Sequence, residues 1–447
     1  MKIQPVKGTR DFYPQDMAVR NWITDGWKKV SIRNGFEEYD GPIFEYLKMY
    51  QIKSGEEIVE QLFSLQDRGG RDLALRPEMT PTLARMVNQQ INSLPRPIKW
   101  FSVPRLFRAE RPQKGRLREF FQWNIDIIGV ESGIGKCLAD AEVIFTTVDY
   151  LRQVGLTSKD IKVKISSREL LSDYLRNLGI TEDKFDSIYA VLDKKAKLPS
   201  DTFEQILKEQ IPDKKITDKI LDFMTVDSIP QLEELLKSKG ESDECTPKLD
   251  IKFVLDYLDM MGVGDFCVYD PSIVRGLAYY TGIVFEVHDV VGELRAICGG
   301  GRYDNLLSDF GGPSISATGM GMGDCVLEIL LQEKGLIEKQ IPKQQLDYFV
   351  ACIGVMGEEA YKIVSKLRSI GYATNFSYKM GGLSKQLKEA SAQNAKKCII
   401  IGEEELKENK LVIRDMKTRE QETVDYDKFL NDLESAQLYQ KKPEVRL

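Results

Sequence analysis

Histidine is almost absent from this sequence: its 447 residues contain only one, His288. A catalytic triad built on histidine, or a metal site with several histidine ligands, is therefore hardly possible within one chain. His288 itself lies in the strand-like run VFEVHD, where we expect it to pack and not to catalyse.

Closely spaced cysteines and long apolar runs are missing as well. The seven cysteines are scattered with no CxxC spacing, which is typical of reduced thiols in a cytosolic protein and not of a disulfide framework or a zinc site. The first residues, MKIQPVKGTRDF, contain no apolar signal region, and no run of 18 apolar residues occurs. We therefore expect a cytoplasmic protein without a membrane segment and without a metal held by the chain itself.

An excess of positive charge is also lacking. The formal net charge is −6 and the pI is about 5.4, which argues against a protein that coats nucleic acid along its whole surface. Any binding of phosphate must therefore be local. The length exceeds that of one ordinary hydrophobic core and predicts two or three domains.

The character of the sequence changes twice along its length. Residues 1–130 mix helical segments with short strand-like runs, whereas residues 157–248 are rich in lysine and acids, with apolar positions at helical spacing. We interpret the second range as a small, largely helical insertion into one interrupted sheet. From about residue 346 strands alternate with helices, which predicts a compact α/β unit with a mainly parallel sheet.

The strongest local signal is the stretch RLFRAERPQKGRLREFFQWNIDIIG, residues 105–129. Its first part, up to Arg118, holds six Lys/Arg and a single acid, and its end buries one acid, Asp126, among apolar residues. Arg108 at the end of a strand, followed by a polar loop and a return strand, forms a hairpin with a fixed cation that suits bidentate binding of phosphate. A solvated basic loop is an equally good explanation of this segment taken alone.

Two further segments place polar groups beside strands. VRGLAYYTGIVFEV sets Arg275 before two tyrosines, which would point to opposite faces of a strand, so that only one could line a given site. LALRPEMTPTLARMV sets Glu78 and Thr80 between a strand and a helix, where they could hold an ammonium group. A core tyrosine pair and a helix cap are the structural alternatives. Glycines in CGGGRYD allow a backbone to approach a ligand or make a tight turn, and GMGMGD departs from a dinucleotide fingerprint.

Taken in order, these segments resemble the class II aminoacyl-tRNA synthetases, and within them the histidyl-tRNA synthetase family. The resemblance covers nearly the whole chain, from KGTRDFYP through LRPEMTP, FRAERPQKGRLREFFQWNIDIIG, VRGLAYYTGIVFE and CGGGRYDNL to the α/β tail. The combination of ERPQKGR with RGLAYY is specific, since other class II families do not carry it.

The resemblance implies an α+β fold. A catalytic domain with a six-stranded antiparallel sheet and flanking helices would be interrupted by the helical insertion and followed by an α/β anticodon-binding domain. The expected ranges are 1–156 and 249–335 for the two parts of the catalytic domain, 157–248 for the insertion and 346–440 for the anticodon-binding domain. A homodimer built partly through the segment around Pro42 is also implied.

The resemblance implies a two-step reaction as well. L-Histidine would attack the α-phosphate of ATP, with Mg2+ as a cofactor, to give histidyl-adenylate and pyrophosphate. The histidyl group would then pass to the 3′-end ribose of tRNA(His). Arg108 and Arg275 would hold the α-phosphate and stabilise the charge that develops there.

The remaining site residues would serve ATP, the amino acid or the tRNA. ATP would be bound by Glu110, facing the adenine, and by Arg116 and Arg118; histidine would be bound by Glu78, Thr80 and Gln122 at its ammonium group and by Asp126 and Tyr280 at its imidazole, with Tyr279 beside them; the acceptor end of the tRNA would meet Arg111 and Gln113.

Two positions depart from the family's pattern. Val326 stands where most class II enzymes have the arginine that binds the γ-phosphate, so pyrophosphate must be held by other groups, such as magnesium with Arg116 or Arg118. Ala278 replaces the acid that is usual in the RGLDYY form of the motif, which leaves open what orients Arg275.

Two other functions fit parts of the pattern. A non-catalytic paralogue, the regulatory subunit of ATP phosphoribosyltransferase, shares the catalytic fold but typically lacks the anticodon-binding domain, and only Val326 favours it. A class II synthetase for another amino acid would need residues other than Asp126 and the tyrosine pair at the base of its site.

Overall fold

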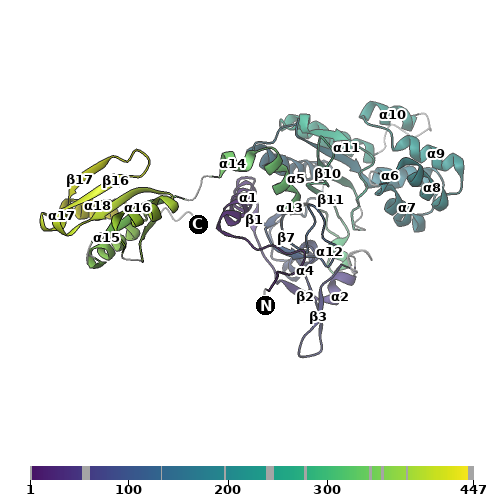
Figure 1. The fold of residues 1–447 in the computed structure, drawn as a ribbon. Coiled ribbons are helices and arrows are strands. Elements are labelled where there is room, and N and C mark those ends of the chain that lie inside the picture. The colour runs from purple at the N-terminus through teal and green to yellow at the C-terminus, as the bar shows by residue number, and fades with distance from the viewer. Residues whose placement is uncertain are drawn as a thin grey trace. The chain divides into compact units, whose positions relative to one another are not determined.

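The computed structural model describes residues 3–52, 61–131, 133–195, 198–237, 246–275, 279–341, 345–353, 357–378 and 381–440. They form two compact units, Met1–Ile341 and Pro342–Leu447 (Figure 1). Within these described ranges we find no helix that is both long enough and apolar enough to span a bilayer.

A large β-sheet organises the first unit. Its strands are β1 (Glu37–Glu38), β5 (Ile98–Ser102), β6 (Arg105–Phe107), β7 (Glu119–Ile128), β8 (Ile161–Ser167), β9 (Cys267–Tyr269), β10 (Ile283–Asp289), β11 (Cys298–Arg302) and β12 (Ala317–Gly323). Among these described strands, six run antiparallel in the order β5-β7-β12-β11-β10-β8, as the resemblance predicted. The short strands β1 and β9 extend the two edges in parallel pairing, and β6 pairs with the start of β7.

One face of this sheet carries the larger hydrophobic core. It is covered by helices α1 (Pro14–Arg33), α5 (Gly133–Gln153) and α13 (Asp324–Glu333). Trp123 of β7 stacks on Trp27 of α1 with ring centroids 6.3 Å apart, and meets Tyr150 of α5 at 5.5 Å. Burying each of these large rings contributes about 2 kcal/mol or more. This layer fixes β7, and with it the side chains on the other face of that strand.

The opposite face is covered only in part. The elements near it are α4 (Thr80–Gln90), α12 (Leu306–Asp309), and a small antiparallel sheet of β2 (Phe44–Tyr46), β4 (Asp72–Leu75) and β3 (Ser64–Gln66) with α2 (Leu47–Gln51) beside it. A second hydrophobic cluster on this side joins Met79 and Leu83 to Val284 of β10 and to tyrosines from several segments. This side also holds the predicted histidine-binding residues Glu78, Gln122, Asp126, Tyr279 and Tyr280.

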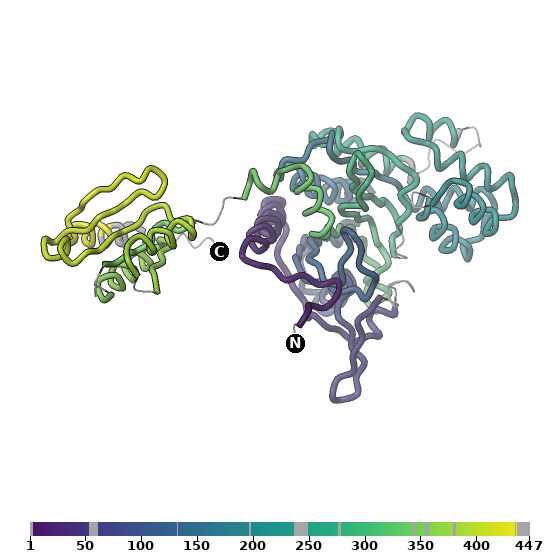
Figure 2. Tube along the Cα trace, in the orientation of Figure 1, coloured from purple at the N-terminus to yellow at the C-terminus, as the bar shows by residue number. Residues whose placement is uncertain are grey.

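A group of helices follows β8 in the chain. It consists of α6 (Arg168–Asn177), a 3-10 turn (Glu182–Lys184), α7 (Phe185–Leu192), α8 (Ser200–Gln210), α9 (Lys214–Phe223), α10 (Ile229–Lys237), α11 (Thr246–Met260) and a second 3-10 turn (Gly264–Phe266). Figure 2 shows the trace of α7 to α10 gathered beside α6, which itself contacts β10. Helix α14 (Leu336–Gln340) ends the first unit.

The expected insertion, residues 157–248, therefore includes a strand that the helical pattern did not predict. In β8, Ile161, Val163 and Ile165 are fully buried in the large core, while the two lysines between them point to the other face. Such alternation over five residues, 161–165, is typical of a strand. It was overlooked because the charged residues resemble those of the helices that follow.

The second unit is an α/β fold, as predicted. Its elements are β13 (Leu346–Cys352), α15 (Gly357–Ser369), β14 (Thr374–Phe376), α16 (Leu383–Ala392), β15 (Ala395–Ile401), α17 (Glu403–Lys407), β16 (Lys410–Asp415), β17 (Gln421–Asp425) and α18 (Tyr426–Gln440). In the order β14-β13-β15-β16-β17 the first two pairings are parallel and the last two antiparallel. The expectation of a mainly parallel sheet was wrong for β16 and β17. A short turn connects these two strands into a hairpin, and the strands of a hairpin are antiparallel.

Candidate active site

The two faces of strand β7 have different chemistry. Trp123 and Ile127 lie in the large core, whereas Gln122, Asn124 and Asp126 alternate with them and point to the partly covered face. Asp126 is only 4% exposed. The buried acid noticed in the sequence thus lies on an inner strand of the sheet, with other polar side chains on the same face.

Glycines form the part of this face that lies next to Asp126. Gly319 of β12 is paired with Asp126 and with Gly301 of β11, and Gly321 of β12 is paired with Gly299 of β11. A Cβ atom at Gly319 would collide with Oδ1 of Asp126, and one at Gly299 would lie 2.5 Å from Nη1 of an arginine described below. Both glycine-rich motifs are therefore strands without side chains on this face, neither a tight turn nor a dinucleotide loop.

Asp126 has a hydrogen-bond partner that the sequence did not indicate. Tyr303, 3% exposed, donates its hydroxyl hydrogen to Oδ1 of Asp126. Burial raises the pKa of Asp126 to about 7, although the bond from Tyr303 acts in the opposite direction. Tyr303 belongs to the CGGGRYD segment, which was singled out for its glycines alone; a tyrosine directly after a glycine-lined strand was the available signal.

Glu78 and Thr80 lie together at the start of α4. Glu78 is buried, and Tyr279 donates a hydrogen bond to its Oε2 at 3.2 Å. The hydroxyl of Tyr279 also bonds the side chain of Thr80, and burial raises its pKa well above the usual value. Met79, not Thr80, occupies the cap position of α4, so the simple cap interpretation of Thr80 does not hold.

Tyr279 and Tyr280 do not point to opposite sides, contrary to the prediction. Both precede β10, which begins only at Ile283, so the alternation of a strand does not apply to them. Their ring centroids are 5.0 Å apart, both rings are buried in the same cluster, and the guanidinium of Arg275 lies 5.7 Å from the ring of Tyr280. Both tyrosines therefore contact site residues.

The predicted basic hairpin is present. Strand β6 ends at Phe107, and Arg108 follows it, with its backbone N–H bonded to the carbonyl of Arg118 across the hairpin. The Arg108 side chain donates from Nε to the carbonyl oxygen of Pro77 at 3.1 Å, and its guanidinium lies 5.2 Å from the ring of Phe120. These contacts fix a cation between the start of β7 and the segment that precedes α4.

The loop of the hairpin is tied together by its own charges. Glu110 forms an ion pair with Arg116, and Arg118 donates from Nε to the carbonyl oxygen of Glu110 at 3.0 Å. The Glu110 side chain is only 9% exposed. The loop is thus partly ordered by internal pairing, which the solvated-loop interpretation does not require.

The outer part of the loop carries the two residues expected to meet tRNA. Arg111 is exposed, and Gln113 accepts a hydrogen bond from Arg295 of the turn between β10 and β11. Arg295 was not predicted, because no motif surrounds it and 182 residues separate it from Gln113.

Arg275 is held by a carboxylate that the sequence analysis missed. Its Nη1 pairs with Oε1 of Glu286 on β10 at 2.5 Å. Its backbone has φ 61°, a conformation that is costly for a residue with a side chain and that clusters at functional sites. Burial by itself would raise the pKa of Glu286, but the hydrogen bond from His288 and the charge of Arg275 lower it to about 2.

Contacts join the two predicted phosphate-binding arginines into one site. Arg108 is bonded to the carbonyl of the proline that precedes Glu78, Glu78 is bonded to Tyr279, and Tyr279 packs on Tyr280. Tyr280 in turn lies against Arg275. The two cations are thus connected through the groups expected to bind the amino acid.

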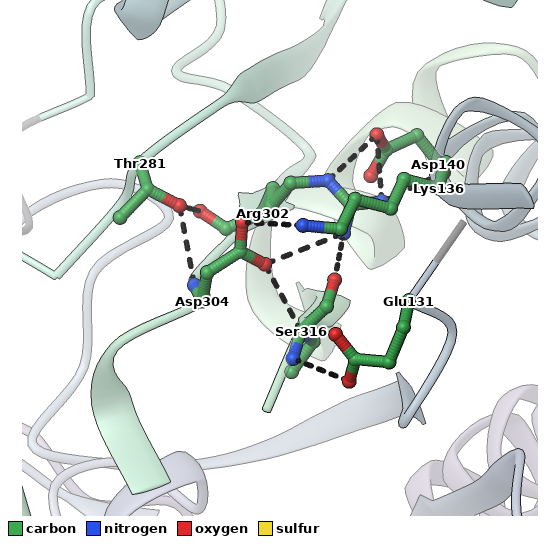
Figure 3. A network of polar contacts seen from close by, with 8 residues as sticks. Glu131, Lys136, Asp140, Thr281, Arg302, Asp304 and Ser316 are labelled. Carbon is green, nitrogen blue, oxygen red and sulfur yellow. Dashed lines mark hydrogen bonds and ion pairs between the residues drawn. The ribbon is translucent and has the colours of Figure 1, made fainter. Parts of the chain in front are cut away.

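A buried ionic network centred on Arg302 connects segments that carry this site (Figure 3). Arg302, at the end of β11, pairs through Nη2 with Asp140 of α5 at 2.9 Å and through Nη1 with Asp304 at 3.4 Å, and also donates to Ser316. The N–H of Thr281 bonds the carbonyl of Arg302 at 2.8 Å. Because Thr281 follows the tyrosine pair and Arg302 follows the glycines, this network holds both parts of the site on α5.

Comparison with known proteins identifies the family. The family model described as "Histidyl-tRNA synthetase" matches residues 8–323, which is most of the chain. The chain belongs to the histidyl-tRNA synthetase family. A second model, "Anticodon binding domain", matches residues 347–435 of the other unit.

Members of the family match along the whole chain. The "Histidine--tRNA ligase" of Opitutus terrae is 40% identical over 417 residues, covering 93% of this chain and 94% of the relative. The "Histidine--tRNA ligase, chloroplastic/mitochondrial" of Arabidopsis thaliana is 38% identical, with 97% and 86% covered. The crystal structure of the histidyl-tRNA synthetase from Nostoc sp. PCC 7120 shares the fold, with a TM-score of 0.79 at 24% identity over 97% of this chain and 99% of that one.

Family membership decides between the alternatives of the sequence analysis. The regulatory paralogue typically lacks the anticodon-binding domain, whereas this chain has one and matches histidine–tRNA ligases over nearly their full length. Membership of the histidyl family likewise excludes a class II synthetase for another amino acid.

Val326 stands where most class II enzymes have the arginine that binds the γ-phosphate, and the hairpin loop covers this position. Val326 is buried on α13, and a Cβ at Gly115 of the hairpin loop would lie 3.0 Å from its Cγ2, so the loop packs over this site. The cation beside this helix, Arg10, forms ion pairs with Asp324 and with Glu328. Ala278, the other departure, lies outside the described residues.

Proposed function

We propose that the site on the glycine-lined face carries out both steps of histidine–tRNA ligation. The observation that carries this proposal is the chain of contacts from Arg108 through Glu78 and the two tyrosines to Arg275. An enzyme that joins an amino acid to a phosphate needs both recognition groups and cations within one small region.

In the first step histidine is bound at both ends. Glu78, Thr80 and Gln122 receive the ammonium group, and Asp126 and Tyr280 receive the imidazole nitrogens, with Tyr279 holding Glu78 in place. Burial of Asp126 supports this assignment. A buried carboxylate that loses a hydrogen-bond partner costs about 2 kcal/mol or more, so that an apolar analogue of histidine would be rejected.

The carboxylate oxygen of histidine then attacks the α-phosphorus of ATP, and pyrophosphate leaves with the electrons of the broken P–O bond. Arg108 and Arg275 hold the α-phosphate and stabilise the negative charge that grows there. Glu110 faces the adenine, and Arg116 and Arg118 lie near the leaving phosphates. Their fixed positions in the hairpin support these roles, since they need no reorganisation during the reaction.

Mg2+ fits this site as an ion that arrives on ATP. Within the described residues no group of three or more His, Cys, Asp or Glu side chains could hold a metal ion, and Glu286, the carboxylate beside Arg275, already binds Arg275 and His288. Mg2+ commonly keeps phosphate and water oxygens and adds at most one or two carboxylates. When bound it would neutralise part of the phosphate charge.

In the second step the histidyl group passes to the 3′-end ribose of tRNA(His). Arg111 and Gln113 at the tip of the hairpin are assigned to the acceptor end, and residues 346–440 to the anticodon. The helical part of residues 157–248, which follows β8, is the insertion between the catalytic parts 1–156 and 249–335. The exposure of Arg111 and the match to the anticodon-binding family support this division.

We further propose a homodimer that uses the segment around Pro42. Phe44, Tyr46 and Leu65 of the small sheet are 54%, 57% and 45% exposed, and the strand register places them on one face. Adjacent exposed apolar side chains of this size commonly mark an interface. A Phe44→Lys variant that sediments as a monomer, while wild type sediments as a dimer, would support this surface.

The cytoplasm is the proposed location. The cysteines in the described part of the chain are unpaired thiols, the state that a reducing compartment maintains.

The experiment that tests the function is ATP–pyrophosphate exchange with each of the twenty amino acids. We expect exchange with histidine alone, followed by transfer of labelled histidine to tRNA(His). A folded protein that binds histidine but exchanges with no amino acid would instead favour the regulatory class and overturn the proposal.

A further inference from the structure

The only histidine of the chain is connected to the proposed catalytic centre. His288 lies two residues after Glu286 on the same face of β10, and its Nε2 is 2.8 Å from Oε2 of Glu286. A carboxylate can only accept, so Nε2–H is the donor. The other oxygen of Glu286 pairs with Nη1 of Arg275. Glu286 thus uses one oxygen for each neighbour, and His288 does not merely pack in the strand as the sequence suggested.

Other cations near Glu286 are bound elsewhere. Lys164 lies directly across from Glu286 on β8, but its ammonium pairs with Asp270 at 3.0 Å. Lys162 lies across from His288, and its ammonium donates to the carbonyl oxygen of Asp265 at 2.5 Å. Among the described residues, the carboxylate of Glu286 therefore pairs with Arg275 and His288 and with no other cation.

The neighbouring strand makes room for this arrangement. Gly299 of β11 is paired with Glu286, and a Cβ there would lie 2.5 Å from Nη1 of Arg275. The guanidinium therefore lies directly against Gly299 of β11, next to the glycine-lined face. Its Nε is buried and has no hydrogen-bond partner within the described part of the chain. Glu286 holds Nη1, a side-chain hydrogen bond joins the guanidinium to Tyr280, and Nε–H is the donor that remains for a ligand.

A guanidinium that binds a phosphate with two N–H groups must be held in a defined orientation. Glu286 supplies that orientation only if its own carboxylate does not rotate. A side-chain carboxylate turns readily about its last bond, and a second hydrogen bond on its other oxygen restricts this rotation.

We propose that His288 is a positioning residue, which fixes Glu286 so that Arg275 presents its Nε–H to the α-phosphate. This inference rests on the proposed role of Arg275 in histidyl-adenylate formation. It adds a residue outside the family's motifs, and it answers the question that Ala278 left open, namely what orients Arg275.

The test compares His288→Ala with His288→Gln, whose amide can still donate to Glu286, and with Lys162→Gln as a matched control on the facing strand. We expect His288→Ala to lower kcat of ATP–pyrophosphate exchange about tenfold, or about 1.4 kcal/mol, with KM for histidine and the thermal midpoint unchanged. His288→Gln should recover most of the loss, and Lys162→Gln should match wild type. Wild-type kcat in His288→Ala would overturn the proposal.

A second readout does not depend on turnover. With 15N-labelled histidine incorporated, the protein carries one imidazole, so its Nε2 resonance reports on Glu286 directly. We expect ATP, added without histidine, to shift this resonance in wild type but not in Arg275→Gln. If ATP binds to wild type without shifting this resonance, the proposed coupling between His288 and Arg275 is rejected, even if exchange proceeds. If the resonance shifts but the protein performs no exchange, the coupling is supported and only the proposed function is rejected.

Discussion

Tyr303 and Asp126 meet in the middle of the glycine-lined face, where the phenol hydroxyl donates to Oδ1 of the carboxylate and both side chains are buried. Because burial raises the pKa of Asp126 to about 7, the carboxyl group changes its charge near neutral pH. The pair therefore governs the charge at the position assigned to the imidazole of the substrate.

The first prediction concerns stability against pH. The pKa of Asp126 is higher in the folded protein than in the unfolded chain. Its contribution to the free energy of unfolding is therefore fully present below about pH 4 and is lost as pH rises through about 7. We expect Asp126→Asn to be more stable than wild type at pH 8, on the order of 2–4 kcal/mol, with a much smaller gain at pH 5. All four tryptophans lie in the first unit, so their fluorescence during urea unfolding measures this unit.

Asp25→Asn, at an exposed acid of α1, is the control for that comparison. An equal effect of Asp126→Asn at both pH values would contradict the raised pKa.

The second prediction concerns Tyr303→Phe. The hydroxyl of Tyr303 lowers the pKa of Asp126, so its removal should raise that pKa further. In ATP–pyrophosphate exchange, the rise of kcat/KM for histidine with pH should move to higher pH in the variant, while KM for ATP stays the same. Titration of the free substrate is common to both proteins and cancels in the comparison. Superimposable profiles would show that this bond does not tune Asp126.

The third prediction concerns the glycines. A methyl group at Gly319 would collide with Oδ1 of Asp126, whereas one at Gly323, at the end of the same strand, would meet nothing within 4 Å. We expect Gly319→Ala to weaken histidine binding at least about tenfold, corresponding to about 1.4 kcal/mol, and Gly323→Ala to leave it unchanged. Calorimetric titration with histidine measures both. Equal affinities for histidine in the two variants would contradict the close contact between Gly319 and Asp126.

The fourth prediction concerns the buried pair of Arg302 and Asp140. Removing one partner leaves the other charge buried, so Asp140→Ala should cost about 3–5 kcal/mol of unfolding free energy. The double variant Asp140→Leu, Arg302→Met should recover much of this loss, since it removes both charges. Tryptophan fluorescence during unfolding checks both. A double variant as unstable as the single one would show that the other bonds of Arg302 dominate.

The sequence predicted the parts of the site that lie within one motif. The hairpin with Arg108, the buried Asp126 and the start of α4 at Thr80 all follow from short patterns. The order of the central strands followed from the resemblance and not from periodicity, because pairing between distant strands leaves no local trace.

Contacts between distant segments account for most of what was missed. Tyr303 and Asp126 are 177 residues apart, and Arg295 and Gln113 are 182 apart, so neither pair can be found from spacing. Glu286 is only 11 residues from Arg275, but the acid lies in a strand that reads as apolar core. The tyrosine pair was misjudged because a strand was expected to begin too early.

The alternation of glycine and methionine in β12 has a wider consequence. Met320 and Met322 are buried in the large core, while Gly319 and Gly321 form the face next to Asp126. One strand thus carries two separate sets of positions. We expect changes at the methionines to alter the packing of the core, and changes at the glycines to alter the shape of the face next to Asp126.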